Sequence, residues 1–161
     1  MMKKLFIIPI IVFCLSPLNA QRVIGYYPQW VQNSFTPDNI DYDVITHVIH
    51  SFAWPDEQGN ILHYDNMLSQ SVNNTVHDNG AKILLCFGGW GQSWGFSASM
   101  STPELREIFI DNIISVCETY NYDGVDIDWE QPVNATEKNN LTTFIAELRQ
   151  AFDDLYPDWI I

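Results

Sequence analysis

The sequence predicts an α/β fold, a (β/α)8 TIM barrel of which these 161 residues supply about the first four βα units. Short apolar runs alternate with amphipathic stretches four times, which is typical of a parallel sheet covered by helices. A complete barrel needs about 250 residues, so the chain is expected to be a partial one. A small open doubly wound sheet is the alternative, and it is disfavoured because no phosphate-binding glycine loop follows the first run.

Four runs rich in β-branched and aromatic residues predict the strands. These strands are expected at 22–27, 44–53, 81–87 and 124–130, and a fifth is expected to open at 159–161. No repeat, low-complexity tract or linker separates them. The residues from 21 onward are therefore expected to form a single domain.

Three amphipathic stretches predict the covering helices. The first is expected to have Asp65 as its N-cap, to carry Met67 and to end at Asn79-Gly80. The second opens with Thr102-Pro103-Glu104, which combines an N-cap, a proline in the first turn and an acid near the positive end of the helix dipole. The third is expected over about 137–156.

Composition narrows the class of function. A hydrophobic content of 47% excludes a disordered chain, and aromatic residues make up 14%, with six Trp. Seven Lys and Arg against twenty Asp and Glu give a net charge of −13, which repels phosphate backbones. We therefore expect no nucleic-acid partner, and the charge is compatible with a neutral polymeric substrate.

Residues 1–20 have the pattern of a secretory signal peptide. Lys3 and Lys4 precede an apolar run over 5–15, and Leu18-Asn19-Ala20 is a plausible cleavage site. The apolar run is short for a bilayer span. We expect a mature chain beginning near Gln21, secreted to the extracellular or periplasmic space, with no membrane association after cleavage.

Two cysteines remain after the leader, and export would permit them to pair. The predicted elements place Cys86 at a strand end and Cys117 within a helix. We therefore expect no disulfide between them.

An acidic strand is the most informative segment. Asp126, Asp128 and Glu130 alternate with apolar residues, so a strand places the three acids on one face. On an exposed edge that face would merely be solvated. The flanking helices predict burial instead, where mutual repulsion retains at least one proton near neutral pH. Such a cluster is an acid catalyst or a cation site. The glycine offset of a calcium loop is absent, and the spacing alone leaves a magnesium site open.

The segment Asp123-Gly-Val-Asp-Ile-Asp-Trp-Glu130 resembles the Asp-Gly-x-Asp-x-Asp-x-Glu signature of glycoside hydrolase family 18, the chitinases and endo-β-N-acetylglucosaminidases. Three other segments resemble the family's first three strands in the right order, namely 23–27, 46–53 and 86–97. The resemblance runs from about residue 22 to 161, which implies a partial family 18 catalytic domain over 21–161.

The resemblance implies a retaining, substrate-assisted mechanism in which the N-acetyl group of the sugar is the nucleophile. Glu130 would be the general acid and then the general base. Asp128 would orient the acetamide, and Asp126 would share a proton with Asp128. Asp123 would have a structural role. No metal ion or cofactor is implied.

The resemblance also implies which residues contact sugar. They are Tyr26, Phe52, Tyr64, Gly88, Gly89, Trp90, Gly91 and Gln131. Tyr26 would in addition hydrogen-bond Asp126. Cys86 stands where the family usually has serine, and because a thiol is a weaker donor than a hydroxyl, Asp126 would be held less firmly.

We therefore expect a secreted hydrolase of β-1,4-linked N-acetylglucosamine polymers, chitin or chito-oligosaccharides. The alternatives are an endo-β-N-acetylglucosaminidase, a non-catalytic chitinase-like carbohydrate-binding protein, which the presence of Glu130 disfavours, and an inactive fragment. The family's tyrosine motif near the sixth strand and its tryptophan on the eighth lie outside these residues. The 161 residues alone are accordingly expected to hydrolyse chitin weakly or not at all.

Overall fold

The computed structural model describes residues 21–161, so the expected leader lies outside the described residues. A sheet carries the fold, and its four main strands are parallel neighbours in chain order. They are β1 (Ile24–Pro28), β2 (His47–Pro55), β4 (Lys82–Gly88) and β5 (Val125–Asp128). The short β3 (Ile61–His63) pairs antiparallel with β2. Beyond β5, Ile160 forms a parallel bridge with Gly124, where a fifth parallel strand was predicted to open.

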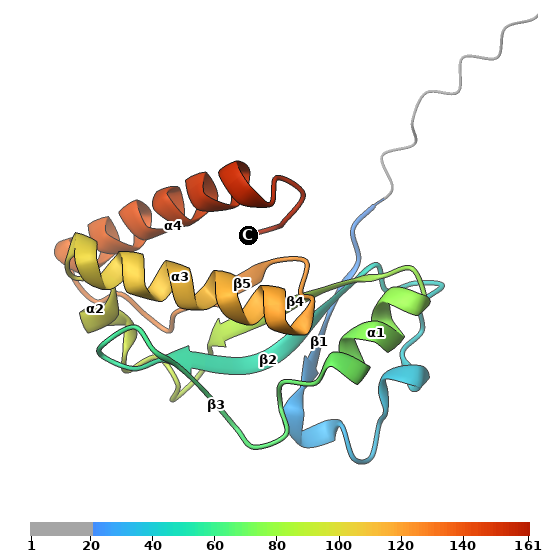
Figure 1. The fold of residues 1–161 in the computed structure, drawn as a ribbon. Helices are drawn as coiled ribbons and strands as arrows, with labels where there is room; N and C mark the ends of the chain where they lie inside the picture. The colour runs from blue at the N-terminus through green and yellow to red at the C-terminus, as the bar shows by residue number, and fades with distance from the viewer. Residues whose placement is uncertain (1–20) are drawn as a thin grey trace, which may run out of the picture.

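Three long helices cover one face of this sheet (Figure 1). They are α1 (Gln70–Asp78), α3 (Pro103–Tyr120) and α4 (Ala135–Leu155). The single turn α2 (Phe96–Ser99) follows β4, and two 3-10 turns occupy Gln29–Val31 and Pro37–Asn39. The Thr102 hydroxyl accepts a hydrogen bond from the Leu105 N–H, so the predicted start of α3 is confirmed.

The predicted start of α1 is wrong. Ser69, not Asp65, is the N-cap, and its hydroxyl accepts a hydrogen bond from the Val72 N–H. Asn66 has a φ of 60°, a left-handed conformation that interrupts any helix beginning at Asp65. Met67 therefore reaches the core from the segment before the helix, and it is fully buried there.

The core lies between the sheet and the helices. The rings of Phe87, Phe109 and Phe144 link β4, α3 and α4, with centroids 5.7 and 5.0 Å apart. His50 of β2 is fully buried, contacts Gln32 and Tyr122 through its two ring nitrogens, and has its pKa lowered to about 4 by burial. It is therefore a neutral core residue at physiological pH.

Cys86 and Cys117 are both free and buried, which confirms the expectation that they do not pair. Among helices of residues 21–161, none combines the length and the apolar character that crossing a bilayer requires.

Candidate active site

The two faces of β5 differ in chemistry. Val125 is fully buried in the helix-covered core and Ile127 packs against it. Asp126 and Asp128 alternate with these residues and lie on the opposite face. In the β4–β5 register Asp126 is the partner of Cys86, and Asp128 is the partner of Gly88. The acidic residues therefore lie on the face of the sheet that the helices leave uncovered.

Asp126 is held by a side chain from a distant strand. The Tyr26 hydroxyl donates a hydrogen bond to Asp126 Oδ2 at 2.8 Å, although β2 and β4 separate their two strands. Only a sheet curved around this face permits such a contact. Burial, and then the hydrogen bond to Asp126, raise the pKa of Tyr26, so its hydroxyl stays protonated and remains a donor.

The Cys86 thiol lies beside the same carboxylate. Its pKa is raised, chiefly by burial and next by the charge of Asp126 and a hydrogen bond to it. A thiol in this state is a protonated donor and not a reactive thiolate. The contact with Asp126 is the one expected for Cys86, and the weaker hold on Asp126 stays a prediction.

The carboxyl group of Asp128 has a shifted pKa. Its pKa is raised by burial first, then by the negative charge of Glu130, and then by that of Asp126. Asp128 therefore retains a proton more readily than a free aspartate. The direction of this shift is the one that mutual repulsion within the acidic strand was expected to produce.

Glu130 lies just past the end of β5 and is exposed. Its backbone N–H donates to the Ser93 hydroxyl at 2.9 Å, and that hydroxyl in turn donates to the Gly89 carbonyl at 3.2 Å. The Glu130–Gln131 peptide bond is cis. The loops that follow β4 and β5 are thus linked directly beneath Glu130.

Two glycines allow β4 to approach β5 closely. Gly88 has a φ of +115°, and a Cβ there would lie 2.1 Å from the Asp128 carbonyl oxygen. The Gly89 N–H donates to that same oxygen at 2.8 Å, and a Cβ on Gly89 would lie 2.8 Å from the Phe52 ring. The expected contacts of these glycines with sugar remain a prediction. The structure gives a separate reason why glycine is needed at these two positions, since both contact the Asp128 carbonyl and fix the backbone of Asp128.

Aromatic rings gather near the carboxylates. Phe52 lies beside Tyr26, with centroids 6.4 Å apart, and stacks on the exposed Trp30 at 6.0 Å. Trp90 is 88% exposed on the loop after β4. Tyr64 packs edge-on against Trp54 and accepts a hydrogen bond from Gln92 of that loop. Phe52 therefore adjoins the Tyr26–Asp126 pair, whereas Tyr64 contacts the loop that follows β4.

Ser93 and Trp30 lie at the candidate site but are not among the residues predicted from the sequence. Trp30 had a detectable signal, because a large aromatic residue directly after a strand lies at the carboxyl end where barrel sites form. Ser93 had none, since its two partners depend on how the loops fold together.

Asp123 lies at the other end of the acidic strand. Its Oδ2 accepts hydrogen bonds from His77 Nε2 of α1 and from the Ile83 N–H of β4, both at 2.8 Å. The side-chain amide nitrogen of Asn121 lies 3.3 Å from His77 Nδ1, the ring nitrogen that does not contact Asp123. These contacts agree with the structural role expected for Asp123.

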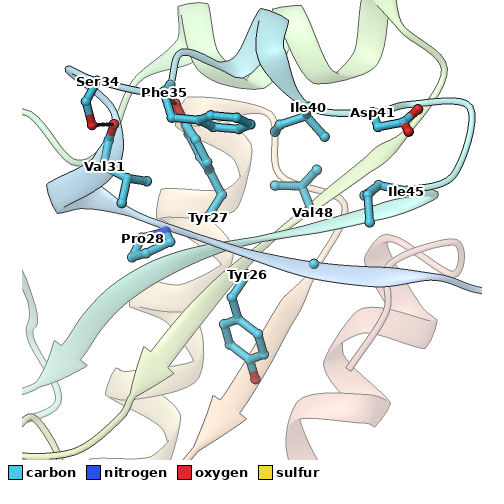
Figure 2. Close-up of a pocket in the computed structure, with 11 residues that line it drawn as sticks. Tyr26, Tyr27, Pro28, Val31, Ser34, Phe35, Ile40, Asp41, Ile45 and Val48 are labelled. Atoms are coloured by element: carbon cyan, nitrogen blue, oxygen red, sulfur yellow. Dashed lines mark hydrogen bonds between the residues drawn. The ribbon is translucent and has the colours of Figure 1, made fainter.

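An apolar hollow of about 500 Å³ lies beside β1, away from these acids. Figure 2 shows Tyr27, Phe35, Ile40 and Val48 converging on it, while the Tyr26 ring points away. Its lining includes the acid Asp41 but none of Asp126, Asp128 and Glu130, so we assign the candidate site to the carboxylate face. Within residues 21–161, no group of three or more His, Cys, Asp or Glu side chains is arranged to hold a metal ion.

Known proteins resemble this chain in sequence and in fold. The sequence model of the glycosyl hydrolases family 18 matches residues 22–161. Probable chitinase 10 of Drosophila melanogaster is 32% identical over 160 residues, which cover 81% of this chain and 7% of that protein. Chitinase-3-like protein 2 of Homo sapiens is 32% identical over 160 residues, covering 93% of this chain and 40% of that protein.

The fold has close counterparts among solved structures. The group IV chitinase of Ostrinia furnacalis, in complex with allosamidin, superposes with a TM-score of 0.74 at 28% identity and covers 82% of this chain and 40% of that one. The chain spans less than half the length of each of these proteins. The chain belongs to glycosyl hydrolases family 18, and its strands and helices form about the first four βα units of that family's (β/α)8 barrel.

Proposed function

We propose that this chain carries the acid–base half of a retaining hydrolase that cleaves β-1,4-linked N-acetylglucosamine polymers, chitin or chito-oligosaccharides. The observation that carries the proposal is the Tyr26–Asp126 hydrogen bond on the uncovered face, beside Asp128, whose pKa is raised by burial and then by the charges of Glu130 and Asp126. Family membership and relatives named as chitinases support the same reaction class.

Each of the three acids has a defined part in the proposed reaction. Glu130 donates its proton to the glycosidic oxygen, and the leaving sugar departs as an alcohol. The acetamide oxygen of the remaining sugar attacks its own C1 and forms a cyclic oxazolinium ion. Water then attacks C1 as the bond between C1 and the acetamide oxygen breaks, and Glu130 takes the proton of the water. The two successive inversions at C1 retain the anomeric configuration. Asp128 orients the acetamide and stabilises its positive charge, and Asp126 holds the proton that Asp128 exchanges.

The chain spans less than half of its relatives' length, so we assign efficient turnover to a complete barrel. For these 161 residues alone we propose weak hydrolysis and measurable binding. Export also remains a proposal, and it rests on the pattern of residues 1–20.

The acetamide requirement tests the proposal directly. Chitotetraose in its N-acetylated form and cellotetraose differ only at C2 of each ring, where an acetamido group replaces a hydroxyl, so calorimetric titration of both into the chain isolates the contribution of the acetamido group. We expect chitotetraose to bind at least about tenfold more tightly, because Asp128 contacts the acetamide N–H. Equal affinities, or no binding of either sugar, would refute the proposed substrate class.

A further inference from the structure

Among residues 21–161, Glu130 has no partner in the sheet. β5 ends at Asp128, and its ladder with β4 ends at the pair formed by Gly88 and Asp128. Glu130 lies two residues past this end and is exposed. A general acid must lie within hydrogen-bond reach of the atom that it protonates, and a displacement of about 1 Å can cost about 10²-fold in rate. A contact from outside the sheet is therefore needed to fix Glu130 relative to Asp128.

The Ser93 hydroxyl supplies such a contact. It accepts a hydrogen bond from the Glu130 N–H at 2.9 Å and donates one to the Gly89 carbonyl at 3.2 Å. The Gly89 N–H donates in turn to the Asp128 carbonyl at 2.8 Å. These three hydrogen bonds tie the backbones of Asp128 and Glu130 to the same residue, Gly89. A serine closes this chain because its hydroxyl both donates and accepts, which an alanine side chain cannot do.

The loop that carries Ser93 is itself held in place. The Gln92 N–H donates to the Gly89 carbonyl at 3.2 Å and closes a four-residue turn over 89–92. The Gln92 side-chain amide donates to the Tyr64 hydroxyl at 2.6 Å, which ties the same loop to a neighbouring segment. Ser93 directly follows this turn and is partly buried. Its hydroxyl therefore comes from a supported backbone, as the positioning of a reactive side chain requires.

The electrostatics of the two acids depend on the same geometry. After burial, the negative charge of Glu130 is the largest cause of the raised pKa of Asp128. This repulsion weakens as the two charges move apart. The pKa of Asp128 is therefore a measure of how closely Glu130 is held beside it.

We propose that Ser93 is a positioning residue, which holds Glu130 beside Asp128 through its hydrogen bonds to the Glu130 N–H and the Gly89 carbonyl. Ser93 acts on the reaction through Glu130 and requires no contact with the sugar. This inference rests on the proposed function for the role of Glu130, whereas the hold on Glu130 is tested without any sugar.

NMR titration of the Asp128 carboxyl group in the full chain tests the hold directly. Ser93→Ala releases Glu130, so the pKa of Asp128 should fall toward that of an ordinary aspartate. Ser93→Thr keeps a hydroxyl on the same Cβ and should restore the parent value. Glu130→Gln removes the charge itself, so adding Ser93→Ala to it should cause no further shift. Ser101→Ala is the matched control, because the Ser101 hydroxyl also donates to a backbone carbonyl, that of Ala98, and the pKa should stay at the parent value.

The rate of hydrolysis gives a second readout. Ser93→Ala should lower the turnover of chitotetraose, measured as reducing-end release, by about 10–10²-fold. The affinity for chitotetraose should not change, because Asp128 still binds the acetamide. Ser93→Thr should recover most of the turnover, and Ser101→Ala should match the parent.

The outcomes separate this inference from the proposed function. If the pKa of Asp128 does not move in Ser93→Ala, or moves by the same amount in the Glu130→Gln background, Ser93 does not act through Glu130 and the proposed function stands. If the parent chain binds no chitotetraose, the proposed function fails, and the titration still decides whether Ser93 holds Glu130. If Ser93→Ala does not fold, hydrogen exchange of the Glu130 amide in the parent decides. Protection of this exposed amide supports the hold, and exchange at the rate of an unprotected amide overturns it.

Discussion

The two ends of β5 carry the same type of side chain in different environments. Asp123, at the amino end, accepts hydrogen bonds from an imidazole N–H and a backbone N–H. Asp128, at the carboxyl end, has its pKa raised by burial first, and then by the negative charges of Glu130 and Asp126. Hydrogen-bond donors contact the first carboxyl group, whereas burial and neighbouring acids disfavour the ionised form of the second. The strand therefore separates residues that serve stability from residues that serve chemistry, as in parallel barrels generally.

The largest expected effect is at the carboxyl end. Glu130→Gln removes the general acid and should lower chitotetraose hydrolysis, measured as reducing-end release over long incubations, by about 10²–10⁴-fold. Its free energy of unfolding should stay within about 0.5 kcal/mol of the parent, because the side chain is exposed. Glu107→Gln, also exposed, is the control for both measurements. Unchanged hydrolysis in Glu130→Gln would remove Glu130 from its proposed role.

The second-largest effect is expected at the amino end of β5, where a substitution should lower stability and leave sugar binding unchanged. Asp123→Ala leaves the Ile83 N–H and His77 without their acceptor, so urea unfolding should show a loss of about 1–3 kcal/mol. Chitotetraose affinity of the folded fraction should be unchanged. Asp111→Ala, on the exposed surface of α3, should change neither quantity. A large loss of affinity with intact stability would show that the two ends are not separated.

The smallest effect concerns pH. The raised pKa of Asp128 means that the folded chain binds this proton more tightly than the unfolded chain, whose aspartates titrate near about 3.9. The contribution of Asp128 to stability is thus fully present below that value and is lost as the pH rises through the folded pKa.

Asp128→Asn keeps this site neutral at every pH. The variant should therefore gain stability relative to the parent between about pH 4 and 7, by less than about 1 kcal/mol because solvent screens a partly exposed carboxylate. Urea unfolding at both pH values measures the gain, with Asp111→Asn as the control. A stability difference that does not change with pH would contradict the raised pKa.

The sequence predicted the parts of the fold that depend on local signals. The capped start of α3 at Thr102 is one example, because an N-cap bonds only to its own first turn. The start of α1 was misplaced because Asp65 has the chemistry of an N-cap, while the left-handed Asn66 prevents a helix there. The strand β3 was missed because three residues become a strand only by pairing with β2.

In the candidate site, too, the features set by local sequence were predictable and the long-range contacts were not. The alternation of Asp126 and Asp128 with apolar residues follows from the period of a strand. The link from Glu130 through Ser93 to Gly89 joins residues 37 and 4 positions apart, and no periodicity encodes it. Likewise, the 2.8 Å contact from Tyr26 to Asp126 spans 100 residues and depends on the curvature of the sheet.

The close approach of Gly88 to the Asp128 carbonyl limits how this barrel can be recombined with others. In a chimera, β4 and β5 taken from different parents would meet where no methyl group fits. A crossover between those strands would require a glycine at position 88 from one parent and, from the other parent, a β5 backbone that lies at the same close distance. Crossovers placed between β2 and β4 leave that contact within one parental block, so libraries cut there should yield more folded members.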